Sequence, residues 1–96
     1  MKLLLIVYSG PEPRSVAHLL DEVQVHGYTW FAPAHGAGAS GRHEGTRAWP
    51  GEATVYFTTL DDATVPRVLE ALRLRRDHGE AGERIHAAVM PVETFI

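Results

Sequence analysis

Hydrophobic residues recur along this chain with two different periods, and the changes of period mark out six elements. Four short runs are continuously apolar or rich in aromatic and β-branched residues, which is typical of strands; they cover residues 3–8, 28–34, 54–60 and 85–92. Two further stretches place apolar residues three or four positions apart, the single stripe of an amphipathic helix; these stripes are Val16, Leu19, Leu20 and Val23, and Val65, Val68, Leu69 and Leu72.

Residues with special backbone or charge preferences support the ends of both helices. Pro13 suits the first turn of the first helix, where its missing N–H is no loss, and Gly27 suits the exit from that helix. Asp61 and Asp62 precede the second stripe, where carboxylates complement the positive end of the helix dipole. Gly79 follows a run of arginines and is expected to end the second helix.

The order of these elements, β-α-β-β-α-β, is that of the ferredoxin-like or split-βαβ fold. We therefore predict one α+β domain over residues 1–96, a ferredoxin-like βαββαβ sandwich with an antiparallel sheet in the order 4-1-3-2 and two helices on one face. Proline within a sheet is largely confined to edges, first residues and bulges. Pro33 and Pro91 fall in the second and fourth strands, which are the edges of this sheet, and the central strands hold none.

The first and last strands are apolar on both sides, although both helices must cover the same face of the sheet. Residues 3–7 read LLLIV and residues 87–90 read AAVM, with no alternation of polar positions. A face that meets water should carry polar residues. The second face is therefore expected to be buried against another subunit, which predicts a homo-oligomer.

The segment of residues 35–52, HGAGASGRHEGTRAWPGE, separates the second and third strands and shows neither a helix nor a strand pattern. A connection this long in a small domain is usually functional or disordered. It holds five of the nine glycines together with Arg42, Arg47 and Trp49, which favours a ligand-binding loop over a disordered hairpin tip. We expect residues 36–48 to be mobile without ligand, because a glycine-rich backbone has much entropy to lose.

Residues 36–41 match the pattern G-x-G-x-x-G and follow a strand. A dinucleotide site also needs a helix that opens on these glycines, and the residues that follow have no apolar periodicity, so a Rossmann site is rejected. The weaker interpretation is an anion-binding nest of consecutive backbone amides, with Arg42 and Arg47 as counter-charge.

Composition and charge narrow the possible functions. With 45% hydrophobic and 22% charged residues the chain is an ordinary globular one, and its net charge of −3 gives no basic footprint for nucleic acid. It has no cysteine, so disulfides, thiolate metal sites and thiol catalysis are excluded. The apolar run at residues 3–7 is too short for a signal peptide or a membrane span, so the expected location is the cytoplasm.

A metal site is another chemistry that the residues allow. His35, His43 and Glu44 lie close together in the 35–52 segment, and imidazole and carboxylate are ligands of zinc and copper. Their spacing matches no specific metal motif. For catalysis, the serines lack a G-x-S-x-G context and no carboxylate pair stands out, so we do not expect an enzyme. A small enzyme on this scaffold stays an alternative, because a fold does not fix a function.

The element order and the loop together resemble the PII family of trimeric signal-transduction proteins. In that family a G-x-T segment of the second strand leads to a G-x-G that opens a long T-loop; here residues 27–29 read GYT, residues 36–38 read GAG, and Gly41 follows. Residues 82–85, GERI, are similar to the end of the family's B-loop, where glycines and a basic residue meet nucleotide phosphates. The resemblance covers nearly the whole chain and makes residues 35–52 a T-loop-like segment.

The resemblance implies a homotrimer with a ligand cleft between subunits. The base of the loop would form one side of the cleft, and the turn of a neighbouring subunit over residues 79–84 would form the other. The implied ligand-binding residues are Thr29, Gly36, Gly38, Gly41, Arg42, Arg47, Gly79, Gly82 and Arg84. Among them, Arg84 would be the principal cation for a phosphate.

Departures from the family pattern limit the ligand that the resemblance implies. The loop has no tyrosine, so the family's modification site is missing, and the chain lacks the family's C-terminal phosphate-binding arginines. Glu80 and Glu83 are expected to repel a triphosphate. The expectation is weak binding of AMP or ADP in preference to ATP, or binding of a small anion.

The implied function is regulatory. A PII-like protein of this kind senses an adenine nucleotide or a small anion and signals through its loop to a membrane transporter or an enzyme, with no obligatory cofactor. The alternative is a zinc- or copper-binding trimer similar to the divalent-cation-tolerance proteins, in which His35, His43 and Glu44 would be the ligands.

Overall fold

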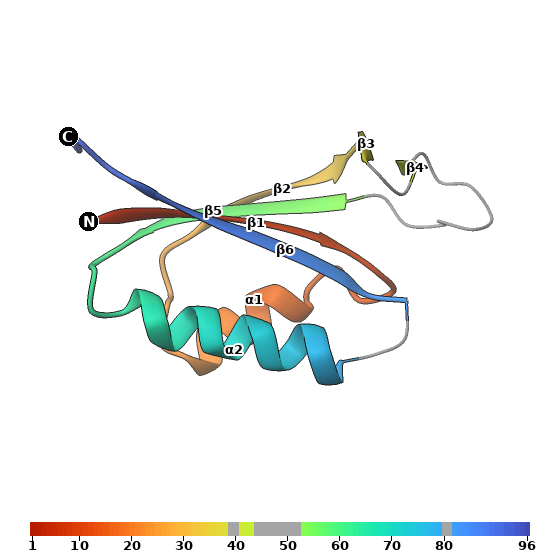
Figure 1. Ribbon diagram of the computed structural model, residues 1–96, viewed down its shortest axis with the longest axis horizontal. Helices are drawn as coiled ribbons and strands as arrows, with labels where there is room; N and C mark the ends of the chain where they lie inside the picture. Colours follow the sequence, from red (N-terminus) through yellow and green to blue (C-terminus); the bar gives the residue numbers. More distant parts are fainter. Residues whose placement is uncertain (39–40, 44–52, 80–81) are drawn as a thin grey trace.

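The computed structural model describes residues 1–38, 41–43, 53–79 and 82–96. In this part of the chain a sheet forms one layer and two helices form a second layer against it (Figure 1). The elements in chain order are β1 Lys2–Ser9, α1 Ser15–Glu22, β2 Thr29–Ala34, β3 Gly36–Gly38, β4 Gly41–His43, β5 Ala53–Leu60, α2 Val65–His78 and β6 Arg84–Pro91. Apart from β3 and β4, these are the elements that the hydrophobic pattern predicts.

The main sheet has the predicted topology. Its strands lie in the order β2-β5-β1-β6, and every neighbouring pair is antiparallel. When the four strands of this sheet are numbered 1 to 4 along the described chain, the order read from the β6 edge is 4-1-3-2. Both helices lie on one face of the sheet (Figure 1), so the ferredoxin-like fold is confirmed. Pro33 and Pro91 lie in the edge strands, and Pro33 falls where the pairing of β2 with β5 shifts between Phe31 and Ala34. Such an irregularity at an edge tolerates a residue without an N–H.

The core lies between the sheet and the helices. Along β1, Leu4, Ile6 and Tyr8 are at most 1% exposed, whereas residues 3, 5 and 7 are only partly buried. This alternation follows from the pleat of a strand. The buried β1 side chains pack against fully buried residues of the other elements, and each aliphatic side chain stabilises the fold by about 1.5–3 kcal/mol through leaving water; the largest of these partners are Tyr56, Val16, Leu20 and Val68.

The first helix ends differently from the prediction. α1 stops at Glu22, and the chain turns at Gln24, which has φ 66° and therefore takes the left-handed conformation. The turn comes this early because Val25 is drawn into the core, where it is 7% exposed and its N–H donates to the Leu20 carbonyl at 2.8 Å. Gly27, the predicted exit, has no positive φ, and its carbonyl accepts a hydrogen bond from the Thr58 hydroxyl.

The second helix starts at an acidic turn, as predicted. The hydroxyl and the N–H of Thr64 both donate to Oδ1 of Asp61, and these hydrogen bonds hold the pKa of that carboxyl below its usual value. Asp62 has a different role, because its carboxylate pairs with the N-terminal ammonium group at 2.9 Å. α2 ends at His78, and Gly79 follows in an extended conformation.

Part of the 35–52 segment has regular structure, so the expectation that it holds no strand was wrong. β3 and β4 pair as an antiparallel hairpin, with Gly36 opposite His43, Ala37 opposite Arg42 and Gly38 opposite Gly41. Three-residue strands made largely of glycine carry no hydrophobic alternation, and the sequence pattern could not reveal them. Residues 39–40 and 44–52 lie outside the described residues, so the predicted mobility over residues 36–48 stays a prediction.

The face of the sheet opposite the helices is largely apolar, and in the described part of the chain no helix covers it (Figure 1). We call it the open face. Phe31, Phe57 and Met90 are 51%, 37% and 38% exposed there, although all three are large hydrophobic residues. Strand register assigns to the open face the apolar residues Leu3, Leu5, Val7, Phe31, Val55, Phe57, Ala88 and Met90, and the polar residues Ser9, Thr29, Thr59, Arg84 and His86. The central strand is thus apolar on both sides, as expected, and burial of this face by another subunit stays a prediction.

Candidate functional site

One end of the main sheet, which we call the loop end, gathers most of the predicted site residues that the structure describes. Ser9, the last residue of β1, lies opposite Arg84 of β6 on one side and Ala53 of β5 on the other. Ala34, the last residue of β2, also lies opposite Ala53, and β3 follows after one residue. The C-terminal end of α2 lies at this end as well (Figure 1). The predicted site residues at the loop end are Gly36, Gly38, Gly41, Gly79, Gly82 and Arg84.

Arg84 lies on the open face at the loop end. Its partner Ser9 follows Tyr8, whose side chain is buried toward the helices, so Ser9 and Arg84 project to the opposite side of the sheet. Arg84 is exposed, and the turn before it contains Gly82 with φ 86°, a backbone conformation that favours glycine. A guanidinium in this position can pair with a phosphate or a carboxylate.

The hairpin of β3 and β4 contributes backbone to the loop end. Gly36, Gly38 and Gly41 lie in its short strands, where the absence of a Cβ lets a ligand approach the chain closely. Arg42 lies in β4 opposite Ala37, but its side chain is outside the described residues, as is the whole of Arg47. The predicted role of these two arginines is therefore not tested.

Thr29 lies at the other end of β2, away from the loop end. It pairs with Phe57, whereas Ala34 pairs with Ala53, so Thr29 and Gly36 are separated by roughly 20 Å of strand. Thr29 borders a largely apolar concavity of about 470 Å³; the other lining residues are Leu3, Gly27, Tyr28, Phe57, Thr58, Thr59, Val92 and Phe95. A single copy of the chain therefore does not bring Thr29 and Arg84 together.

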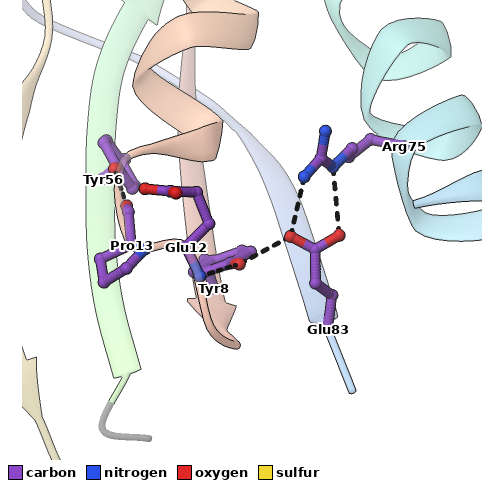
Figure 2. Close-up of polar contacts among 6 residues, drawn as sticks. All are labelled: Tyr8, Glu12, Pro13, Tyr56, Arg75 and Glu83. Atoms are coloured by element: carbon purple, nitrogen blue, oxygen red, sulfur yellow. Dashed lines mark hydrogen bonds and ion pairs between the residues drawn. The ribbon is translucent and has the colours of Figure 1, made fainter. Parts of the chain in front are cut away.

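A buried carboxylate just before β6 pairs with side chains of α2 and β1 (Figure 2). The side chain of Glu83 is only 3% exposed. Its Oε1 accepts a hydrogen bond from Nε of Arg75 at 3.1 Å, and its Oε2 accepts one from a terminal nitrogen of the same guanidinium at 3.0 Å. The Tyr8 hydroxyl donates to Oε2 at 2.6 Å. We call Tyr8, Arg75 and Glu83 the anchor.

The anchor changes the expected electrostatics of the site. Glu83 was expected to repel a triphosphate, but its charge is paired with Arg75 and its carboxylate points into the protein (Figure 2). A carboxylate neutralised in this way repels an anion on the open face only weakly. The repulsion expected from Glu83 is therefore reduced, whereas Glu80 lies outside the described residues.

Sequence reasoning did not identify Tyr8 or Arg75 as part of the site. Tyr8 and Glu83 are 75 positions apart, and their contact follows from the pairing of β1 with β6 rather than from any local pattern. In the sequence, Arg75 belongs to the run of arginines before Gly79, which was expected only to mark the end of the second helix. One signal in the sequence could have indicated such partners: Glu83 stands in a turn that was expected to bind phosphate, so its negative charge must be compensated by another residue.

The tyrosine of the anchor is held in its neutral form. Burial raises the pKa of Tyr8, and the hydrogen bond to the Glu83 carboxylate raises it further, because ionisation would place two negative charges together. The same hydroxyl accepts a hydrogen bond from the N–H of Glu12 at 3.1 Å. The anchor thus joins β1 and the turn before α1 to α2 and β6.

The metal alternative gains no support from the described residues. Among residues 1–38, 41–43, 53–79 and 82–96, no group of three or more potential metal ligands lies close together. His35 is exposed, and the side chain of His43 and all of Glu44 are outside the described part. The predicted ligand set of His35, His43 and Glu44 is therefore not assembled by what the structure describes.

Comparison with known proteins defines the class of fold. Neither a protein-family model nor a curated protein sequence matches the chain. Solved structures do match, and they share the fold of PII-like proteins. One is CPII, a nitrogen regulatory PII-like protein from Thiomonas intermedia K12 bound to ADP, AMP and bicarbonate; it has a TM-score of 0.65 and 22% identity, over 93% of this chain and 86% of CPII.

Two further structures give the same result. The apo form of CPII matches with a TM-score of 0.59 and 18% identity, over 93% of this chain and 89% of the other. A protein from Thermus thermophilus that is assigned a PII-like signalling role matches with a TM-score of 0.60 and 18% identity, over 92% of this chain and 82% of the other. The PII-like fold expected from the sequence resemblance is thereby confirmed. Within the described residues no helix is long and apolar enough to cross a membrane.

Proposed function

We propose that this chain is a PII-like regulatory protein that senses an adenine nucleotide, AMP or ADP, or a small anion such as bicarbonate. The structural neighbour CPII is bound to ADP, AMP and bicarbonate and shares the fold over 93% of this chain. The observation that carries the proposal is the loop end, where Arg84 begins the edge strand β6 and the glycine backbone of the β3–β4 hairpin follows the opposite edge strand β2. This combination of one guanidinium and close backbone approach suits a phosphate or a carboxylate.

We propose further that the site is completed by a neighbouring subunit of a homotrimer. In one chain, the Thr29 concavity and Arg84 lie at opposite ends of the sheet, so one copy alone does not enclose a nucleotide. A second copy docked on the open face would bring its Arg84 to the first copy. The exposure of Phe31, Phe57 and Met90 on that face supports such docking, because large apolar patches mark interaction surfaces.

The proposed preference is for AMP or ADP over ATP. Because Glu83 is paired with Arg75, repulsion by Glu83 contributes less to this preference than the sequence suggested. The preference rests instead on the small number of cations near the proposed site: in the described part of the turn before β6 the cation is Arg84. A triphosphate would therefore keep much of its charge uncompensated.

Signalling is proposed to pass through the 35–52 segment to a partner protein, either a membrane transporter or an enzyme. The backbone glycines of β3 and β4 lie at the loop end beside the edge strand β2, so an anion bound there by Arg84 of a neighbouring subunit would contact the base of this segment. Ordering of a segment by ligand contacts is an established form of switching. Ligand binding would then change which surface the segment offers to its partner.

Titration calorimetry with AMP, ADP, ATP and bicarbonate tests this function. Arg84→Ala should weaken the binding of AMP or ADP by about 1.5–3 kcal/mol, the contribution of a hydrogen bond to a charged group. Arg73→Ala is the matched control, because it removes the same charge from an exposed position on α2 and should leave affinity unchanged. Hydrogen exchange of the β3 and β4 amides should slow when ligand is added. Absence of binding by all four compounds at millimolar concentration would overturn the proposal.

A further inference from the structure

The anchor does more than stabilise the fold, because its residue Glu83 directly precedes Arg84, the cation proposed to bind the anionic ligand. Glu83 and Arg84 are adjacent, and Arg84 is the first residue of β6. Neighbouring side chains of an extended chain point to opposite faces. Because the Glu83 carboxylate is held on the helix side by Arg75 and Tyr8, Arg84 is directed to the open face.

The Glu83 carboxylate is tightly packed by described residues on both sides of it. A Cβ on Gly79 would lie 2.5 Å from Oε1 of Glu83 and would also clash with the Arg75 carbonyl. A Cβ on Gly10 would lie 3.1 Å from Cγ of Glu83 and 2.7 Å from the Tyr8 hydroxyl. Both glycines therefore leave the space that the Glu83 side chain occupies, and the residues around it come from segments far apart in sequence.

We infer that Glu83 is a positioning residue for ligand binding: its pairing with Arg75 and Tyr8 sets the placement of Arg84 on the open face, and the affinity for an anion depends on that placement. The inference rests on the proposed function for its ligand but not for its geometry. It assigns an indirect role to a carboxylate that would otherwise oppose an anionic ligand.

The first test compares variants of the anchor by calorimetry with AMP and ADP. Glu83→Gln keeps the volume of the side chain, but its amide NH2 group would face the hydrogen-bond donors of Arg75 or Tyr8. Two donors cannot pair with each other, so Glu83 and the residues next to it should shift. We expect about tenfold weaker binding for Glu83→Gln and for Arg75→Met, which is about 1.4 kcal/mol. The control Arg73→Met removes the same charge from a 59% exposed side chain of α2 and should change affinity less than twofold.

A combination with Arg84→Ala separates positioning from general loss of stability. If Glu83 acts through Arg84, then Glu83→Gln should weaken binding tenfold in the wild-type background but less than twofold in the Arg84→Ala background. Equal losses in both backgrounds would show that Glu83 supports the fold without positioning Arg84, and the inference would be overturned. Tyr8→Phe removes a single hydroxyl from the anchor and serves as the second variant if Glu83→Gln does not fold.

A measurement without ligand keeps this inference distinct from the proposed function. Amide hydrogen exchange at Gly82, Glu83 and Arg84 should be at least tenfold faster in Glu83→Gln or Tyr8→Phe, with exchange in the middle of β1 unchanged. If the wild-type protein binds none of the compounds but these amides exchange faster in the two variants, the proposed function fails and the positioning by Glu83 stands. Unchanged exchange at these amides in both variants would contradict the positioning itself.

Discussion

At the residue scale, the hydroxyl groups of two buried tyrosines connect separate segments of the chain through hydrogen bonds. The Tyr8 hydroxyl donates to Glu83 and accepts from the Glu12 N–H, while the Tyr56 hydroxyl donates to the Pro13 carbonyl at 2.6 Å (Figure 2). Both rings are at most 2% exposed, so each hydroxyl is a polar group that must find partners inside the protein. Burial is the main cause that raises the pKa of each tyrosine. Both phenols are therefore neutral in the folded chain over the ordinary pH range.

These raised pKa values predict a loss of stability at alkaline pH. A group whose folded pKa lies above its unfolded value stabilises the fold below the unfolded value, here 10.0, and this contribution disappears as pH rises through the folded pKa. The urea midpoint should therefore be constant from pH 7 to about 9 and should fall above pH 10.0. Tyr8→Phe should cost about 1–3 kcal/mol at pH 7, because it leaves buried partners unpaired, and should make the alkaline decline less steep. An equally steep decline in Tyr8→Phe would contradict this assignment.

The anchor also shows which residue-scale features a sequence can give. Arg84 could be selected as a cation near the site because its neighbours match a known pattern. The pairing of Glu83 with Arg75 and Tyr8 could not, since three elements must first be placed before these side chains meet. A sequence pattern indicates which positions carry charged side chains, but it does not show which of these charges are neutralised by ion pairs in the folded protein.

At the element scale, the long elements were predicted well and the short ones were not. The strands β1, β5 and β6 and the helix α2 each carry at least eight residues, enough for a continuous apolar run or a helical period to be visible. β3 and β4 have three residues each and depend on backbone pairing, which leaves no side-chain pattern. The end of α1 was missed for a related reason, because burial of Val25 sets the turn at Gln24 and overrides the preference for glycine.

The junction of α2 with the following turn provides a prediction at this scale. Gly79 has φ −80°, which any residue adopts, so its importance lies in contacts rather than in backbone conformation. In Gly79→Ala the new methyl group would clash with the Arg75 carbonyl and with Oε1 of Glu83, and the variant should lose about 1–3 kcal/mol of stability. Gly27→Ala is the matched control, since a Cβ there meets no atom within 4 Å, and it should be neutral or stabilising by up to about 1 kcal/mol. Urea unfolding of both variants measures the difference, and equal stabilities would disprove the packing argument.

At the scale of the whole molecule, the two faces of the sheet are both apolar but only one is covered within the described chain (Figure 1). The covered face holds the core, and its contacts are made between elements of one copy. The open face carries Arg84 at its loop end, so the surface proposed to dock another subunit and the residue proposed to hold the ligand adjoin each other. Assembly and ligand binding would therefore depend on the same face.

This arrangement predicts that one charge on the open face separates the subunits. Phe57 lies on β5 opposite Leu5 and is 37% exposed, so Phe57→Glu should place an unpaired carboxylate in the interface. Such a charge costs at least about 3 kcal/mol, which raises the dissociation constant by about 100-fold or more. Sedimentation velocity should find a trimer for the wild-type chain and a monomer for Phe57→Glu. Leu74→Glu is the matched control: Leu74 is 53% exposed on α2, in the opposite layer, and its variant should stay trimeric. A wild-type monomer would refute the assembly, whereas a wild-type dimer would keep the buried face and exclude the three-fold arrangement.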